Sequence, residues 1–462
     1  MKRRTFLKTV AASPAAPALG RVLGANDRIR VAQIGCGGRG LYEIDVCRRL
    51  PGVEVVAVCD VYLPLVDKAR KMLDGKADGY QDFRRVLDRR DIDVVFVSTP
   101  DHWHALITIM ACQAGKDVFC EKPLSLTIAE GRKMVEAARK YGRIVQTGSQ
   151  QRSAPHFQQA VELIQKGELG KISLVEAWNW TNESPIGIGN PPDEDPPPGL
   201  DWDLYLGPAP WRPYNRNRFI WNYRWFWDYS GGMMTDWGAH HMDVVHWAMQ
   251  VDAPLAVSAA GGKFVLQDNR ETPDTFEALF EYPGFIARYT HRTANAHPTE
   301  GRSYGMAFYG DRGTLVIDRE GFEIIPEMRG ERFAPDVDRV QELLRGGEPP
   351  RPRDREALAR GRTRRPPTHP LCRPLIVSDV FMEPAVQEMH VLNFLQAVRD
   401  RKLPNADVEI GHRSATACHL AVIAYRLGRR IRWDREREEI VGDPEAQRMT
   451  SRPYRSPWKL EV

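Results

Sequence analysis

Residues 30–49 read RVAQIGCGGRGLYEIDVCRR: an apolar run, a glycine-rich hexapeptide and then a helical pattern. The run Arg30–Ile34 predicts a buried strand, and Leu41–Arg49 predicts the helix that follows it. Glycines spaced as GxGxxG allow a tight turn, a close approach of the backbone to a pyrophosphate, and close packing of helix on strand. This order of elements predicts a dinucleotide-binding Rossmann fold. The hexapeptide is Gly35-Cys36-Gly37-Gly38-Arg39-Gly40.

The end of the second predicted strand indicates which dinucleotide is bound. The strand Val53–Cys59 is followed by Asp60, 20 residues after Gly40. An acid at this place accepts a hydrogen bond from the 2′-hydroxyl of the adenosine ribose and would repel a 2′-phosphate. The sequence therefore predicts NAD rather than NADP, with its phosphates at the helix N-terminus, where free N–H groups and the helix dipole favour negative charge.

Alternation of short apolar runs with amphipathic segments continues to about residue 149. Amphipathic helices are predicted at Leu65–Leu73 and Ala105–Ala114. Strand–helix alternation of this kind is typical of a parallel, doubly wound sheet, here over residues 28–149. Further strands are predicted at Val94–Ser98, Val118–Cys120 and Ile144–Gln146.

The second half of the chain has a different pattern, with alternating polar and apolar residues typical of an antiparallel sheet with one covered face. Tyr282-Pro283-Gly284 is a turn signal and predicts a hairpin. The expected fold class is α/β + α+β: a Rossmann domain, then a mostly antiparallel sheet domain over residues 150–440 with helices on one face, and a tail over 441–462. The elements predicted there are strands Ile172–Trp180, Asp274–Glu281, Phe285–Arg292, Gly305–Phe308 and Thr314–Asp318, and helices Gln387–Arg399 and His412–Arg426.

The first 25 residues are unlike the rest of the chain. They carry five basic residues, and no acid precedes Asp27. The run Arg3-Arg4-Thr5-Phe6-Leu7-Lys8 resembles the twin-arginine export motif, and the weakly apolar stretch after it is broken by Pro14 and Pro17. We predict a signal peptide over residues 1–25, export to the periplasm or beyond, and no stable membrane span in the mature chain.

Charge and cysteine content disfavour two further classes of protein. The formal net charge of +4 includes the five basic residues of the leader, so the mature chain is nearly neutral and does not resemble a nucleic-acid binder. Seven cysteines without a CxxC pair do not form a disulfide framework. Residues 345–374, rich in Pro and Arg, predict a solvated insertion. The broad face of a strand-rich domain leads us to expect a homodimer or homotetramer.

Two of the predicted parallel strands end in polar motifs. The fourth strand is followed by Thr99-Pro100-Asp101-His102-Trp103-His104, and the fifth ends in Cys120-Glu121-Lys122-Pro123. Ligands of open α/β sheets bind at the carboxyl ends of the strands. We therefore expect Lys122 at the ligand site rather than on the outer surface.

Residues 231–243 read GGMMTDWGAHHMD, with Asp236 and His240 four residues apart on one face of a helix. Oxidation of a secondary alcohol sends a hydride to nicotinamide and a proton to a base, and histidine titrates near neutral pH. The predicted catalytic residues are His240 as base, Asp236 fixing its tautomer, and Lys122 as donor to the developing oxygen anion. A zinc site of His240, His241, Asp243 and His246 is allowed by spacing, but no cysteine joins it, and no metal is predicted.

Together these motifs resemble the glucose–fructose oxidoreductase/inositol dehydrogenase/MocA family from residue 28 onward, and residues 310–313 and 409–413 resemble its exported branch. The resemblance implies that Glu121 and Lys122 lie beside the nicotinamide ribose, with a cis bond before Pro123. It also implies that Asp236 and His240 form the family's D-x-x-x-H pair. The cofactor-binding residues predicted from motif and resemblance are Gly35, Gly37, Gly38, Arg39, Gly40, Asp60, Thr99, Pro100, His104, Glu121 and Lys122.

Nine of the twelve tryptophans fall between residues 178 and 247, interleaved with Tyr and Arg. Flat aromatic faces pack on the C–H faces of sugar rings, while Arg and Tyr bind hydroxyls. We therefore expect a sugar or polyol substrate, with about half of these rings serving the core or an oligomer interface instead. The predicted substrate contacts are Arg152, Tyr214, Arg224, Trp227 and Asp243.

Export constrains the reaction, because little free NAD is available outside the cytoplasm. One hypothesis is a tightly held NAD regenerated in each cycle, either by reducing a second sugar or in a glycosidase similar to glycoside hydrolase family 109, with transient oxidation at C3 and elimination of the aglycone. The alternatives are a simple dehydrogenase with another acceptor and a non-catalytic sugar-binding protein. The intact residues Lys122, Asp236 and His240 disfavour the last of these.

Overall fold

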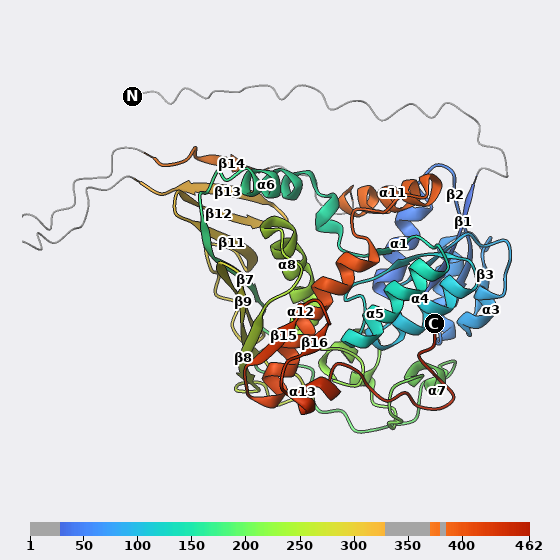
Figure 1. The fold of residues 1–462 in the computed structure, drawn as a ribbon. Helices are drawn as coiled ribbons and strands as arrows, with labels where there is room; N and C mark the ends of the chain where they lie inside the picture. Colours follow the sequence, from blue (N-terminus) through green and yellow to red (C-terminus); the bar gives the residue numbers. More distant parts are fainter. Residues whose placement is uncertain (1–27, 329–369, 379–384) are drawn as a thin grey trace, which may run out of the picture.

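The computed structural model describes residues 28–328, 370–378 and 385–462 (Figure 1). The predicted signal peptide and most of the predicted insertion at 345–374 lie outside these ranges. All seven cysteines lie inside them, and all are free and buried. No helix in the described ranges is long and apolar enough to cross a membrane.

The N-terminal domain is a six-stranded parallel sheet in the order β3-β2-β1-β4-β5-β6, with helices on both faces, so the predicted doubly wound sheet is confirmed. The strand order reverses between β1 and β4, and ligands bind at the carboxyl ends of strands on either side of such a reversal. The strands are β1 (Ile29–Ile34), β2 (Val53–Cys59), β3 (Asp78–Tyr80), β4 (Val94–Val97), β5 (Asp117–Cys120) and β6 (Val145–Thr147). The helices are α1 (Gly38–Cys47), α2 (Leu63–Met72), α3 (Phe83–Leu87), α4 (Asp101–Gln113) and α5 (Ile128–Lys140).

Local sequence explains where these elements begin. Every residue of β4 is buried, as expected for a central strand covered on both faces. Helix α5 starts with a capping box: the Thr127 hydroxyl accepts from the Glu130 N–H, and the Glu130 carboxylate accepts from the Thr127 N–H.

The second domain is a ten-stranded, mostly antiparallel sheet in the order β14-β13-β12-β11-β7-β10-β9-β8-β15-β16. The predicted hairpin is confirmed, since Tyr282 pairs with Phe285 across the turn. The β7–β10 pair in the middle of the sheet is parallel. The strands of the ten-stranded sheet are β7 (Ile172–Trp180), β8 (Ala256–Gly262), β9 (Thr275–Tyr282), β10 (Phe285–Arg292), β11 (Tyr304–Gly310), β12 (Gly313–Asp318), β13 (Gly321–Pro326), β14 (Leu375–Val377), β15 (Ile431–Asp434) and β16 (Glu439–Ile440).

Helices cover one face of this sheet, between it and the Rossmann domain (Figure 1). They bury an apolar core against the sheet that includes Met242, Phe280 and Leu420. Helix α12 also packs on α5, which joins the two domains. The covering helices are α6 (Pro155–Gln165), α8 (Met233–Met249) and α12 (Val408–Leu427), and shorter elements are η2 (Gln150–Ser153), α7 (Trp202–Leu206), η3 (Arg216–Arg218), η4 (Ile220–Trp225) and α13 (Pro444–Arg448).

Two late segments of the chain pack on the N-terminal domain. Helix α11 (Ala385–Asp400) lies beside α1 and places Phe394 against Phe96 and Phe119 of the parallel sheet. The C-terminal tail places Trp458 against Trp103, with ring centroids 4.7 Å apart. The division at residue 150 therefore describes the sheets well, but the Rossmann core is completed by residues from the far end of the chain.

Candidate active site

The glycine-rich loop leaves β1 and enters α1 next to the end of β4. Gly35 has φ +89°, and a side chain there would come within 2.6 Å of the Ser98 carbonyl. A Cβ at Gly40 would lie 1.8 Å from the Gly35 oxygen. By contrast, nothing lies within 4 Å of the Cβ positions at Gly37 and Gly38. The outer glycines are required by packing, and the inner two border open space at the start of a helix, which fits a pyrophosphate.

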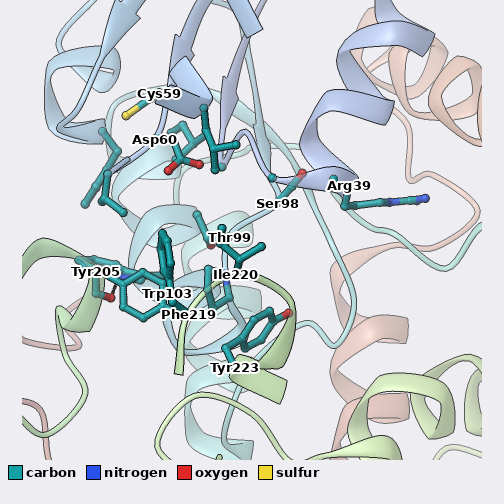
Figure 2. A pocket seen from close by; sticks show the side chains of 18 of the residues that line it. Arg39, Cys59, Asp60, Ser98, Thr99, Trp103, Tyr205, Phe219, Ile220 and Tyr223 are labelled. Carbon is teal, nitrogen blue, oxygen red and sulfur yellow. Dashed lines mark hydrogen bonds between the residues drawn. The ribbon is translucent and has the colours of Figure 1, made fainter. Parts of the chain in front are cut away.

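This loop forms part of the wall of a cavity of about 450 Å³ (Figure 2). Asp60, Ser98 and Thr99 come from the carboxyl edge of the parallel sheet, and side chains of the second domain face them from the opposite side. Of the predicted cofactor residues, those that line the cavity are Gly35, Gly37, Gly38, Arg39, Asp60, Thr99 and Pro100.

Asp60 lies in the cavity wall at the place expected for a ribose ligand. Its carboxylate accepts hydrogen bonds from the backbone N–H groups of Cys36, at 2.7 Å, and Tyr62, at 2.9 Å. Burial raises the pKa of Asp60 to about 6, and these two N–H groups oppose that rise. The carboxylate is thus held by the glycine loop in the orientation that a ribose hydroxyl needs.

Glu121 connects the glycine loop with the motif at the end of β5. Arg39 Nε donates to Glu121 Oε1 at 2.8 Å, and the Ser98 hydroxyl donates to Glu43 close by. Burial and the charge of Glu121 raise the pKa of Glu43. Burial also opposes ionisation of Glu121, but Arg39, the hydrogen bond with Glu43 and the charge of Lys122 together lower its pKa. Glu121 is therefore the ionised member of the pair, fixed one residue before Lys122. The Lys122–Pro123 bond is cis, as the resemblance implied.

Lys122, Asp236 and Arg224 form a partly buried ion triad. Lys122 Nζ donates to Asp236 Oδ1, and Arg224 Nε donates to Asp236 Oδ2 at 3.1 Å. Burial opposes ionisation of Asp236, but the two cations hold its pKa well below the usual range. The triad brings together the end of β5, the segment η4 and the first turn of α8. It adjoins the cavity, since Arg224 is one of the lining residues.

His240 lies one turn after Asp236 on α8 and is 5% exposed. Burial and the positive charges of Arg319 and Lys122 lower its pKa well below the ordinary value, so the imidazole is neutral. The structure corrects the expectation that Asp236 fixes its tautomer, because in the described ranges no hydrogen bond joins the two side chains and the carboxylate accepts from Lys122 and Arg224 instead. Two cations bind the carboxylate of Asp236 more strongly than a neutral ring would.

His104 also differs from its expected role. Its Nδ1 and Nε2 lie 2.8 Å from the carbonyl oxygens of Pro123 and Thr99, respectively, and it does not line the cavity. The side chain therefore ties together the loops after β4 and β5. Gly40, Glu121 and Lys122 are likewise outside the lining, in the supporting layer and the adjoining triad.

Of the five predicted substrate contacts, only Arg224 lines this cavity. Arg152 and Asp243 instead form a buried ion pair at 2.8 Å, beside a separate cavity next to Trp247. Tyr214 is buried in an aromatic cluster against Trp202. Trp227 lines a further cavity with Arg426. Nearness to the catalytic helix in sequence does not reveal which side of that helix a residue occupies.

Sequence reasoning did not place the second-domain side of the cavity. The available signal was the aromatic cluster between residues 178 and 247, which we interpreted as a sugar site. Flat apolar side chains serve equally well as walls for a nucleotide. The lining residues from this segment are Leu204, Tyr205, Phe219, Ile220, Trp221, Tyr223 and Arg224.

Two of the four residues considered for zinc, Asp243 and His246, bind other side chains. His246 Nε2 lies 2.7 Å from the Tyr282 hydroxyl, and Asp243 is paired with Arg152. In the described part of the chain no group of three or more His, Cys, Asp or Glu side chains is arranged to hold a metal ion.

Comparison with known proteins agrees with this architecture. The inositol 2-dehydrogenase of Salmonella typhimurium is 36% identical over 146 residues, which are 30% of this chain and 44% of that protein. A glycosyl hydrolase family 109 protein of Shewanella sp. (strain MR-4) is 32% identical over 130 residues, 26% of this chain and 28% of that protein. The matched stretches thus span less than half the length of these curated relatives.

Solved structures match over most of the chain at low identity. Levoglucosan dehydrogenase in complex with NADH gives a TM-score of 0.61 at 17% identity, covering 87% of this chain and 98% of that one. The WlbA dehydrogenase of Bordetella pertussis, in complex with NADH and UDP-GlcNAcA, gives 0.60 at 18%, covering 88% and 99%. These likenesses show the fold.

Two family descriptions cover most of the chain. "Oxidoreductase family, NAD-binding Rossmann fold" matches residues 29–149, and "Oxidoreductase family, C-terminal alpha/beta domain" matches residues 159–264 and 376–460. Both halves carry the prefix Gfo/Idh/MocA, and the glycine loop, the Lys122 motif and α8 all lie within the matched residues. The chain therefore belongs to the Gfo/Idh/MocA family of oxidoreductases.

Proposed function

We propose that the protein is an exported, NAD-dependent enzyme that oxidises a secondary hydroxyl of a sugar or polyol with a tightly held cofactor. The observation that carries the proposal is the ion triad of Lys122, Asp236 and Arg224 at the edge of a cavity walled by the glycine loop. A dinucleotide in that cavity would have its phosphates at the start of α1 and its ribose at Asp60. Glu121 and Lys122 follow β5 at the same sheet edge.

In the proposed mechanism, the residues of the triad and His240 have different roles in the proton transfer. NAD, when bound, supplies the hydride acceptor. Asp236 keeps Lys122 oriented, so that its ammonium group can donate a hydrogen bond to the substrate oxygen as negative charge develops there. His240 is neutral and can accept a hydrogen bond from the substrate hydroxyl, but its lowered pKa makes it a weaker base than the near-neutral histidine that the sequence predicted.

A redox-neutral glycosidase is the second candidate. The match to a glycosyl hydrolase family 109 protein supports it, and so does a cofactor cavity walled by both domains, which suits a cofactor that is not exchanged. In this cycle the substrate hydroxyl is oxidised, the acidified neighbouring C–H loses its proton, the aglycone leaves by elimination, and water and the returned hydride restore the sugar.

The test uses mature protein as purified, with no added NAD, incubated in heavy water with a panel of aryl glycosides and free sugars. Growth of NADH absorbance with a free sugar or polyol is the expected result for the oxidoreductase. Release of a sugar carrying deuterium at C2 would instead show that the protein is a redox-neutral glycosidase. Binding of sugars without either signal would leave a binding protein and contradict both enzymatic proposals.

Asp60 should determine both the affinity and the choice of dinucleotide. Asp60→Ala is expected to weaken NAD binding roughly 10- to 100-fold, the range of one charged hydrogen bond, while NADP binding should not weaken. Titration of cofactor-free protein with each dinucleotide measures this. Because the pKa of Asp60 is about 6, NAD affinity of the native protein should fall as the pH drops through 6, and that of the variant should not.

The exposed Asp67 on α2 provides the control, since Asp67→Ala removes a nearby charge that does not line the cavity. Equal NAD affinity in Asp60→Ala and the native protein would remove Asp60 from the ribose site.

A further inference from the structure

One segment of the second domain crosses the cavity from the side opposite the glycine loop. We call residues 219–224 the strap. Figure 2 shows Phe219, Ile220 and Tyr223 on this segment, facing the side that carries Asp60 and Ser98. All but Asn222 of the strap residues line the cavity. The dinucleotide site thus has a wall that does not belong to the Rossmann domain.

The strap holds an unfavourable backbone conformation at the cavity. Ile220 has φ +51°, in the left-handed region that β-branched residues rarely adopt. Its side chain is 47% exposed, and that of Trp221 is 70% exposed. Two large apolar side chains are therefore presented to the cavity and to solvent rather than to the protein core. A bound ligand would give them a surface to cover.

The base of the strap is fixed rigidly to the second domain. Trp225 is buried, and its carbonyl accepts from the N–H groups of Glu271 and Thr272 at 2.9 and 3.2 Å. The guanidinium of Arg270 stacks on the Trp225 ring at 4.6 Å. At the other end, the Asn217 amide donates to the Ile188 carbonyl at 2.8 Å. The strap is therefore anchored to the second domain on both sides, at Asn217 and at Trp225.

The middle of the strap is tied to the catalytic carboxylate. Arg224 donates to Asp236, and its guanidinium lies over the Trp221 ring at 4.0 Å. The Tyr223 hydroxyl donates to Asp101 at 3.2 Å. Moving Trp221 away from the cavity would displace the cation stacked on it. That cation also binds Asp236, so the cavity wall and the ion triad share the Arg224 guanidinium.

We propose that the strap is part of the dinucleotide site and that the Arg224–Asp236 pair must open before the cofactor can leave. The catalytic triad thereby holds the dinucleotide in place between turnovers. The inference rests on the proposed function only in taking NAD as the ligand. It assigns Trp221 and Arg224 to cofactor retention, a role that neither the glycine motif nor the resemblance gives them.

The experiment follows exchange of bound NAD for isotopically labelled NAD by mass spectrometry, with no substrate present. Native protein is expected to exchange slowly, over hours. Trp221→Ala, which removes the wall, and Asp236→Asn, which weakens the ion pair without touching the adenosine side, should each exchange roughly 10- to 100-fold faster. Trp211→Ala is the matched control, because Trp211 is 64% exposed, lies near the strap in sequence and does not line the cavity.

Each outcome decides one step. If Trp221→Ala exchanges NAD at the native rate, the strap does not act as a wall of the dinucleotide site. If Asp236→Asn exchanges NAD at the native rate, the Arg224–Asp236 pair does not control release of the cofactor. Arg224→Gln opens the same pair from the other side and replaces Asp236→Asn if that variant does not fold. Exchange within seconds in the native protein would reject retention and the tightly held cofactor of the proposed function, while leaving NAD-dependent oxidation intact. Failure to bind any dinucleotide would reject both proposals.

Discussion

Replacing Lys122 by alanine is expected to lower kcat/KM roughly 30- to 900-fold, a loss of about 2–4 kcal/mol of transition-state stabilisation. In the proposed mechanism Lys122 donates to the substrate oxygen, and its ammonium is hydrogen-bonded to Asp236. Its removal also leaves Asp236 paired with Arg224 alone. The measurement is steady-state kinetics on the substrate found in the sugar panel, with bound NAD quantified in each preparation.

The kcat/KM of His240→Ala should fall by a similar factor, because the substitution removes the neutral side chain that the proposed mechanism uses as proton acceptor. Lys133→Ala is the control: Lys133 lies on α5 of the same domain, pairs with Glu136 at the surface and should leave kcat/KM unchanged. Near-normal turnover in Lys122→Ala or His240→Ala, with NAD still bound, would remove that residue from the mechanism.

The Rossmann domain could be predicted because its signals are local. The glycine loop, the apolar strands and the acid after β2 each lie within a few residues of the feature they specify. In the second domain, β7 and β10 were predicted to the residue: β10 alternates clearly, whereas β7 alternates at its start and is buried throughout its last four residues. Strands β14 and β16 have three and two residues, too short to show a period. The parallel pairing of β7 with β10 joins segments more than 100 residues apart, and no local pattern encodes it.

The sequence predicted which residues belong to the candidate site, but not which of their side chains bind one another. Asp236 and His240 share a helix face, yet Asp236 binds two cations contributed by β5 and the strap. Arg152 and Asp243 looked like substrate contacts, but they neutralise each other in the interior. A charged residue near a catalytic helix can serve either purpose, and only the tertiary structure shows which partner lies within reach. For the same reason, the sequence could not show that the strap, residues 219–224, lines the cavity.

Replacing Arg270 by alanine is expected to lower the free energy of unfolding by about 3–5 kcal/mol, as for other broken buried ion pairs. The side chains of Arg270 and Asp268 are both 0% exposed, with Nη2 to Oδ2 at 2.8 Å, and Arg270 also donates to Glu183. Denaturant unfolding of native and variant protein measures the difference. Arg216→Ala is the control, since Arg216 pairs with Glu194 at the surface and should unfold like the native protein.

Two further variants separate the lost charge pair from the lost packing against Trp225. Arg270→Met keeps an apolar stem beside that ring but leaves Asp268 buried without its cation, so it should remain strongly destabilised. Adding Asp268→Asn removes the uncompensated charge and should recover part of the loss. If the double variant were no more stable than Arg270→Met alone, the uncompensated charge of Asp268 would not be the main cause of the loss. The stability of this region would then depend on the other contacts of the Arg270 guanidinium, including its hydrogen bond to Glu183.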